Sequence, residues 1–348
     1  MDNPVSGRTS GRVTIREVAE GAGVSVAAVS KVLRNAYGVS AELRAKVEAS
    51  IAALNYRPNT AARGMRGQTY TIGVLMADVK NPFYPEILEG INDGLTGTQY
   101  IPLIGIGRSM AATETNIVNA MVDRQMDGIV MIGQRLDTPG LEKVGKELPI
   151  VVIGHHEPTA TAFDTVNNDD ERGGVLVVEH LLQQGFKRPA MITLSRKLLG
   201  RVDVSNRREL GFTKAMQAAG LGHYIHIEAA DAQLDDVTAT VRTLIESPEP
   251  PDAIFGWADY YALEVLSAVR ALGLRVPEDI GVIGYDNSEP CSFTQNDLTS
   301  IDQKGREIGR NATRLLLERI GGRAQAEHFV SEPLVSARGS TRRPEQLD

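Results

Sequence analysis

The chain has 348 residues, of which 42% are hydrophobic, 23% are charged and 5% are aromatic. This length is enough for two or three domains with buried cores, and the single cysteine, Cys291, excludes an internal disulfide framework. No stretch approaches the roughly 18 apolar residues of a membrane span, and the first residues lack the basic and apolar segments of a secretory signal. We therefore expect a cytoplasmic protein with no membrane partner.

Charge is divided unevenly along the chain. The first 68 residues carry ten lysines and arginines against five acids, a net charge of +5. The other 280 residues carry 27 basic residues against 39 acids, a net charge of -12. A basic module joined to an acidic body indicates that only the N-terminal part meets a polyanion such as nucleic acid. Chance fluctuation in a short segment is the alternative that the charge pattern leaves open.

The N-terminal region fits three short helices. Thr14 precedes the first and stands three residues before Glu17, which is the spacing of a capping box. Ser25 is expected to cap a second helix that runs to about Leu33, and Ser40 to cap a third. The first two, joined by a tight turn with glycine, have the proportions of a helix-turn-helix, whose second helix enters the major groove of DNA. An ordinary three-helix subdomain is the alternative.

The second of these helices has an apolar face and a face free to meet base edges. The outward face holds Val26, Ala27, Ser30 and Lys31. The hydroxyls of Thr14, Ser25 and Ser30, with the amide groups at the helix N-termini, are expected to hold phosphates, which sets register without reading sequence.

From residue 70 onward, apolar runs of strand length alternate with helical segments. The runs lie at 71–76, 101–106, 128–132 and 150–153, then at 190–194, 225–228, 253–257 and 280–285. Such a pattern predicts parallel α/β sheets covered by helices on both faces. The two groups of four strands predict an α/β fold with two doubly wound parallel-sheet lobes, preceded by the small all-α helix-turn-helix domain.

Motifs along the whole chain resemble the LacI/GalR family of transcription factors. They are VTIREVA at 13–19, AGVS at 22–25, VSKVL at 29–33, LNYRPN at 54–59, TIGV at 71–74, NPFY at 81–84, EHLL at 179–182, GYD at 284–286 and RGST at 338–341. The resemblance is specific because the motifs keep their order and spacing. It implies a dimeric repressor that binds a palindromic operator in double-stranded DNA and responds to a small effector, with a sensor that resembles periplasmic binding proteins.

The resemblance also implies domain boundaries. A disordered tail would cover 1–12, the DNA-binding head 13–57, a hinge helix 58–69 and the effector-binding and dimerisation domain 70–341. Within that last domain, the N-lobe would comprise about 70–168 with 299–325, and the C-lobe about 169–298 with 326–341.

The DNA contacts that the resemblance implies lie in the head and the hinge. Base-reading positions fall on Val26 and Ala27, which could read only thymine methyl groups or shape, and on Lys31, which could donate to guanine. Two hinges of a dimer would enter the minor groove and wedge Met65 between base steps, although a plain linker is the alternative. The full expected set is Thr14, Ser25, Val26, Ala27, Ser30, Lys31, Asn35, Tyr56, Asn59, Ala62, Arg63 and Met65.

Effector contacts are expected where strands end, because doubly wound sheets bind ligands at their carboxyl edge. The resemblance places ligand contacts on Arg208 and Asp286, and on Asp259, whose usual asparagine neighbour is replaced by Ala258. Simple core packing is the alternative for each residue. The full expected set is Phe83, Tyr84, Arg208, Trp257, Asp259 and Asp286. A carbohydrate is the expected effector, and purine-type ligands or a phosphoprotein partner are the alternatives within the family.

Patterns for catalysis or metal binding are weak. The sequence Gly-Ile-Gly at 105–107 lacks the third glycine of a dinucleotide fingerprint, and the adjacent His155 and His156 cannot share a helix face. We therefore expect no enzyme activity, no cofactor and no metal. The main alternative function is a cytoplasmic solute-binding sensor whose N-terminal helices contact proteins, and the basic head argues against it.

Overall fold

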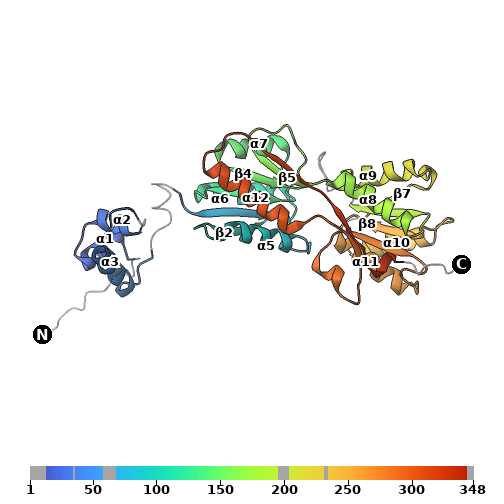
Figure 1. The fold of residues 1–348 in the computed structure, drawn as a ribbon, viewed down its shortest axis with the longest axis horizontal. Helices are drawn as coiled ribbons and strands as arrows, with labels where there is room; N and C mark the ends of the chain where they lie inside the picture. The colour runs from blue at the N-terminus through green and yellow to red at the C-terminus, as the bar shows by residue number, and fades with distance from the viewer. Residues whose placement is uncertain (1–12, 34–35, 58–67, 195–203, 231–233, 343–348) are drawn as a thin grey trace. The chain divides into compact units, whose positions relative to one another are not determined.

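The computed structural model describes residues 13–33, 36–57, 68–194, 204–230 and 234–342 (Figure 1). The chain divides into two compact units, with the boundary between Thr69 and Tyr70. The first unit is all helical and the second consists of two α/β lobes. These classes are the ones that the sequence predicts.

The first unit contains α1 (Ile15–Ala22), α2 (Val26–Leu33) and α3 (Ala41–Ala53). The capping box is confirmed: the backbone N–H of Thr14 donates to the Glu17 carboxylate at 2.7 Å, and the Thr14 hydroxyl accepts from the Glu17 backbone. The Ser25 hydroxyl accepts from the backbone N–H of Ala28 at 3.1 Å, and the Ser40 hydroxyl caps α3 in the same way. Each helix therefore begins at the residue that its sequence predicts.

A small apolar core holds these helices together. Val18 of α1, Val29 of α2 and Val47 of α3 are fully buried in it. The backbone of α1 lies against α3 at Gly21, because a Cβ atom there would stand 2.7 Å from the Ser50 hydroxyl oxygen. Three short helices with so little buried area depend on close contacts of this kind.

The first lobe is built on a sheet with the strand order β11–β5–β4–β3–β1–β2, in which every pairing is parallel. Its strands are β1 (Thr71–Met76), β2 (Ile101–Ile106), β3 (Gly128–Ile132), β4 (Ile150–Ile153), β5 (Asp164–Asn168) and β11 (His328–Ser331). One face packs against α5 (Tyr84–Leu95) and α12 (Gly305–Ile320), and the other against α6 (Ala111–Asp123) and α7 (Thr138–Glu147).

The second lobe has the strand order β12–β10–β9–β8–β6–β7, in which only the pairing of β12 with β10 is antiparallel. Its strands are β6 (Pro189–Leu194), β7 (His226–Ala230), β8 (Ala253–Gly256), β9 (Gly281–Asp286), β10 (Thr299–Asp302) and β12 (Leu334–Ser336). Its helices are α8 (Asp170–Gln183), α9 (Val204–Ala218), α10 (Leu234–Ile245) and α11 (Asp259–Ala271). Short 3-10 turns lie at Gly222–Tyr224, Glu289–Ser292 and Gly339–Thr341.

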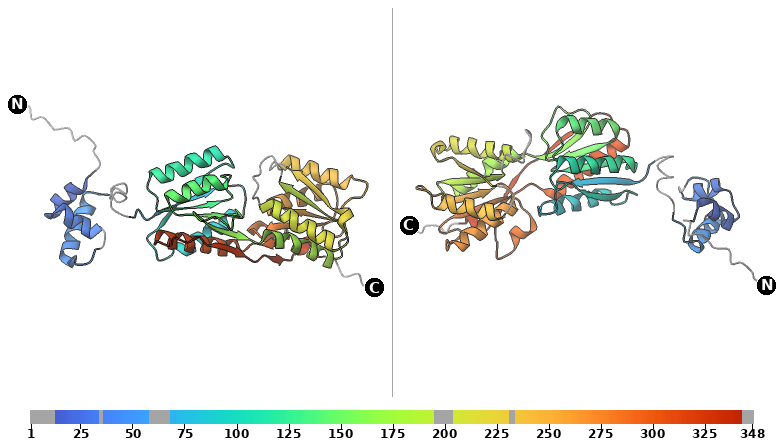
Figure 2. Two further views of the ribbon diagram at one scale, coloured as in Figure 1. Left: turned by 90° about the horizontal axis from the view of Figure 1, so that it is seen from above. Right: turned by 180° about the vertical axis from the view of Figure 1, so that it is seen from behind.

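Two boundaries of the lobes differ from the expected ones. β10 pairs with β9 in the second sheet, and β11 pairs with β5 in the first. The chain therefore changes lobe after Asp302 and after Ser331, rather than at 299 and 326, as can be followed in Figure 2. β5, β10, β11 and β12 were not predicted because they are short and carry polar residues, so no apolar run marks them.

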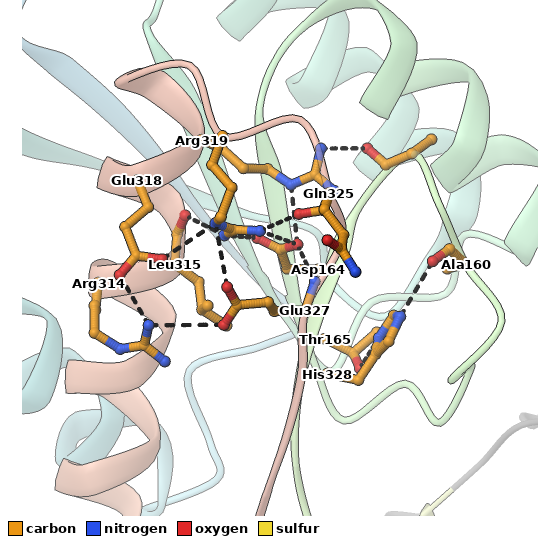
Figure 3. A network of polar contacts seen from close by, with 12 residues as sticks. Ala160, Asp164, Thr165, Arg314, Leu315, Glu318, Arg319, Gln325, Glu327 and His328 are labelled. Carbon is orange, nitrogen blue, oxygen red and sulfur yellow. Dashed lines mark hydrogen bonds and ion pairs between the residues drawn. The ribbon is translucent and has the colours of Figure 1, made fainter.

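A network of charged side chains fastens the last part of the chain to the first lobe (Figure 3). The fully buried carboxylate of Asp164, at the start of β5, forms an ion pair with Arg319 at 3.0 Å and with Arg323 at 2.6 Å. It also accepts from the backbone N–H of Glu327 at 2.8 Å, just before β11. One carboxylate thus holds the end of α12 and the beginning of β11 against β5.

We expect Asp164→Asn to lower the free energy of unfolding of the second unit by about 3 kcal/mol, because it leaves two guanidinium groups without their buried counter-charge. The matched control is Asp93→Asn, which breaks a bidentate arginine pair with Arg306 on the surface. Denaturant unfolding should show a change for the control too small to separate from wild type, because exposed pairs contribute little. Equal losses in the two variants would contradict this role for Asp164.

Candidate functional site

The DNA-binding residues expected in the head fall into two groups. Val26, Ala27 and Lys31 lie exposed on α2, opposite the buried Val29 and Val32 side chains. They form a surface on which base-edge contacts are sterically possible.

The remaining head residues have structural roles of their own. The hydroxyls of Thr14 and Ser25 cap α1 and α2, and Ser30 is half-buried. Tyr56 packs partly buried against the core of the three helices. The other expected contacts, Asn35, Asn59, Ala62, Arg63 and Met65, lie outside the described residues.

Arg208 of α9 lies at the centre of the effector candidates and is only 2% exposed. Its Nε atom donates to Asp170 Oδ1 at 2.8 Å, and its Nη1 atom donates to the backbone carbonyl of Trp257 at 2.5 Å. Asp286 Oδ1 lies 3.8 Å from the same Nη1. The guanidinium carbon also lies 3.6 Å from the centre of the Tyr285 ring. We call Asp170, Arg208, Trp257 and Asp286 the Arg208 cluster.

The close approach of α8 and α9 places Arg208 beside Asp170. A Cβ atom on Gly174 would stand 2.3 Å from the backbone oxygen of Arg208, and one on Gly211 would stand 2.0 Å from that of Glu171. Only glycine permits this backbone contact at both positions. Gly174 and Gly211 therefore let α8 and α9 pack closely, and this packing positions the Arg208 side chain.

Asp170, the first residue of α8, has both carboxylate oxygens occupied. His156 Nε2, from the loop after β4 in the first lobe, lies 2.7 Å from Asp170 Oδ2, while Arg208 holds Oδ1. Burial raises the pKa of the Asp170 carboxyl, but Arg208 and His156 outweigh it, so the pKa lies below its ordinary value. Asp170 therefore stays ionised and joins the two lobes through its partners.

Asp286 ends β9 with an unusual backbone angle, φ of 121°. Its Oδ1 atom accepts a hydrogen bond from the Gln303 side chain, whereas Oδ2 has no partner among the described residues. Burial raises the pKa of Asp286 well above its ordinary value, although Arg208 opposes the shift. A buried acceptor oxygen without a partner is costly, and a ligand hydroxyl would satisfy it.

Trp257 and Asp259 lie next to each other where β8 ends. The Trp257 ring packs edge-on against Tyr260 and Tyr261, and its Nε1 atom has no partner in the described part of the chain. The buried Asp259 carboxylate accepts from the backbone and hydroxyl of Ser288 at 2.7 and 2.9 Å, and from the Ser300 hydroxyl at 2.6 Å. Protein groups therefore already occupy the oxygens of Asp259.

The first lobe supplies Tyr84 to the site and Phe83 to its own core. Phe83 is buried and packs with α5 and α12. Tyr84 lies beside Gly133 at the end of β3, where a Cβ atom would stand 2.6 Å from its hydroxyl. Burial and then the negative charge of Asp78 raise the pKa of Tyr84, and Asp286 of the second lobe adds to the rise.

Sequence reasoning missed four polar residues of this region. Asp170 reads as an ordinary acid in the first turn of a helix, and His156 as half of a histidine pair without a metal. Gln134 follows the predicted strand at 128–132, whereas Asn167 lies in β5, which was not predicted; each has a buried side-chain oxygen without a partner among the described residues. A polar residue near the carboxyl end of a predicted strand is the signal that could have identified Gln134.

Within the described ranges, no helix is both long and apolar enough to cross a membrane. No group of three or more histidine, cysteine or acidic side chains is placed to hold a metal ion in those ranges.

Comparison with known proteins decides the family. A model of "Bacterial regulatory proteins, lacI family" matches residues 14–59, and a "Periplasmic binding protein-like domain" matches residues 178–341. The transcriptional repressor CytR of Escherichia coli (strain K12) is 30% identical over 333 residues, which span 94% of this chain and 96% of CytR. The chain belongs to the LacI family. Catabolite control protein A of Priestia megaterium is 32% identical, over 92% of this chain and 96% of its own.

Solved structures of transcriptional regulators match the fold along the chain. The Lac repressor dimer bound to operator and the anti-inducer ONPF has a TM-score of 0.81 and 25% identity, and the match covers 95% of this chain and 99% of that one. A complex of the regulator CelR with cellobiose has a TM-score of 0.68 and 28% identity, over 94% and 100%. The predicted family, the predicted fold and the assignment as a regulator rather than an enzyme are therefore confirmed.

We expect Asp286→Asn to stabilise the folded protein near neutral pH. Because the folded pKa lies above the ordinary value of 3.8, the folded state binds the proton more tightly, so stability falls as pH rises through the raised pKa. The neutral variant lacks this cost and should be about 1 kcal/mol more stable at about pH 7.5, with the gap closing towards about pH 4.

The control for this prediction has the opposite sign. Arg275 lowers the pKa of the exposed Asp279 carboxyl to about 2, so that pair contributes stability that is lost as pH falls through this value. Asp279→Asn should therefore lower the unfolding temperature near neutral pH, or leave it unchanged. Thermal unfolding across pH checks both variants, and a less stable Asp286→Asn at neutral pH would show that its charge is stabilising.

Proposed function

We propose that this LacI-family chain is a ligand-responsive transcriptional repressor that acts in the cytoplasm, as a homodimer on a palindromic operator. The match of the family's DNA-binding model to residues 14–59 carries the proposal. The helix caps, the exposed outer face of α2 and the basic charge of the head support it. The operator-bound dimer of the similar Lac repressor supports the dimer and the operator.

The recognition surface has little hydrogen-bonding capacity. Val26, which is 40% exposed, and Ala27 offer only apolar contacts, suited to thymine methyl groups. Lys31 supplies a cation in the last turn of α2. We propose that the head also contacts DNA through Thr14, Ser25, Ser30, Asn35 and Tyr56. The proposed minor-groove contacts are Asn59, Ala62, Arg63 and Met65.

The edge strand β2 suits an interface between two copies of the second unit. Ile101, Leu103 and Ile104 are between 44% and 61% exposed, and Met110 after the strand is 56% exposed. Neighbouring apolar side chains on an unpaired strand edge are a liability unless another chain covers them. A second copy of this chain would cover them and bring two heads to the half-sites of one operator.

The effector site of the proposal is the Arg208 cluster with Tyr84. Aromatic rings, a buried donor and a buried acceptor fit a carbohydrate, because sugars combine apolar ring faces with hydroxyl groups. The cellobiose complex of the similar regulator CelR favours the same class. Phe83 and Asp259 support the site without contacting the effector. Phe83 packs in the core of the first lobe, and Asp259 is held by its serine partners.

Effector and operator would be linked through the arrangement of the two lobes. The His156–Asp170–Arg208 chain joins the first lobe to the effector residues of the second. An effector that prefers one arrangement of the lobes shifts the population towards it. Operator affinity then changes by the same factor as effector affinity, since the coupling is reciprocal.

Selection of genomic fragments by the purified full-length protein, followed by sequencing, tests the proposal as a whole. We expect a shared palindrome with two half-sites and binding that weakens steeply with salt, because phosphate contacts release counterions. Fragments that share a single half-site would contradict the dimer, and no enrichment with or without a panel of sugars would contradict DNA binding.

A single substitution in α2 tests the recognition surface. We expect Lys31→Ala to weaken operator binding about tenfold or more, consistent with about 1–3 kcal/mol for a specific base contact. Lys46→Ala is the matched control, because Lys46 lies on α3 and already pairs with Glu42 at 2.8 Å. Filter-binding or anisotropy titrations measure the affinity for operator and for random DNA. If Lys31→Ala lowers both affinities equally, Lys31 contacts a phosphate and not a base.

A further inference from the structure

The Arg208 cluster has a charge arrangement that restricts which effectors it can bind. We propose that it accepts an uncharged, hydroxyl-bearing effector and excludes effectors that carry a phosphate or a carboxylate. This inference rests on the proposed function in one respect, that the effector binds at this cluster.

Two of the three nitrogen atoms of the Arg208 guanidinium, Nε and Nη1, already face protein acceptors. Asp170 Oδ1 lies 2.8 Å from its Nε atom, Asp286 Oδ1 lies 3.8 Å from its Nη1 atom, and the Tyr285 ring covers one face of the guanidinium. An anion that approached Arg208 would meet two carboxylates around one cation. To bind at Nε it would have to displace Asp170 and leave that carboxylate buried without Arg208 as its counter-charge, which is strongly unfavourable.

Asp170 is also unable to turn away from Arg208. His156 holds its Oδ2 atom at 2.7 Å, and both side chains are almost completely buried. The pair is therefore fixed from the first lobe as well as from the second. A cluster with flexible counter-ions could exchange one for a ligand phosphate, but this one is held at both oxygens.

The atoms that remain without partners fit a hydroxyl group. Trp257 Nε1 is a buried donor and Asp286 Oδ2 a buried acceptor, and neither has a partner among the described residues. Both residues adjoin the Nη1 atom of Arg208. A hydroxyl donates one hydrogen bond and accepts others, so it satisfies both atoms, whereas an ionised carboxylate has no hydrogen to donate to the Asp286 oxygen.

The first lobe also has buried neutral acceptors, close to the carboxyl ends of β3 and β5. Gln134 Oε1 and Asn167 Oδ1 are buried amide oxygens without partners in the described chain. The nearby Arg135 guanidinium is offset by the buried carboxyl of Glu114, which interacts with it electrostatically and accepts from its backbone N–H at 2.6 Å. This lobe therefore also offers acceptors to hydroxyl groups rather than an unopposed cation.

Calorimetric titration of the full-length wild type with matched pairs of compounds tests the proposal. The pairs are glucose with glucose 6-phosphate and with gluconate, ribose with ribose 5-phosphate, and adenosine with its monophosphate. We expect any neutral member that binds to do so at least about 100-fold more tightly than its anionic partner, as expected when a buried polar atom is left without a partner. An anionic member that binds as tightly as its parent would overturn the proposal.

Asp170→Asn reverses the arrangement and gives a test that does not depend on finding the natural effector. With Arg208 released, inorganic phosphate at about 50 mM should raise the unfolding temperature of the variant by several degrees and leave that of the wild type unchanged, since a ligand stabilises only the state that binds it. Glu171→Gln is the matched control. It removes the acid next to Asp170 in the sequence and releases a surface cation, Lys214, from a 2.5 Å ion pair.

Two results decide this second test. Stabilisation of Asp170→Asn by phosphate beyond that of Glu171→Gln supports the proposal, and equal or absent stabilisation in a folded variant overturns it. If Asp170→Asn does not fold, the wild type and Arg208→Lys decide the test. Phosphate that stabilises the wild type but not Arg208→Lys overturns the proposal. Phosphate that leaves the wild type unchanged supports it. Operator binding, measured on the same samples, reports separately on the proposed function.

Discussion

A guanidinium cannot lie inside a protein without a counter-charge, and the second unit depends on meeting this requirement twice. Asp170 meets it for Arg208 at the junction of α8 and α9, where His156 of the first lobe holds the other carboxylate oxygen. Asp164 meets it for Arg319 and Arg323, and so fastens the end of α12 to β5. Asp164 begins β5 and Asp170 lies just after β5 ends, so one short polar segment holds both the candidate effector site and the last strand of the first lobe in place.

Much of the fold follows from the sequence because its signals are local. The caps at Thr14, Ser25 and Ser40 mark the helices of the head, and eight apolar runs mark β1 to β4 and β6 to β9. The strands that sequence reasoning missed, such as β5 and β11, are held by side-chain contacts between segments about 160 residues apart. No local pattern encodes contacts of that separation, which is why the two later lobe boundaries were misplaced.

The candidate site divides in the same way. Arg208, Trp257 and Asp286 could be placed from motifs and strand ends, and the structure brings them together. The roles of Asp170 and His156 depend on which helix and which loop face each other, and that information exists only in the folded chain. Phe83 shows the reverse case, since an aromatic residue at a strand end proves to be part of the core. Asp259 likewise has its oxygens engaged by serines rather than free.

The path of the chain through the two lobes has a consequence for synthesis. The head is one continuous segment, complete once α3 has been made, so it can fold on the ribosome early. Neither lobe is continuous: the first lacks an edge strand until Ser331 and the second until Ser336. A ribosome that stops before these residues therefore releases a chain with a finished head and an unfinished sensor.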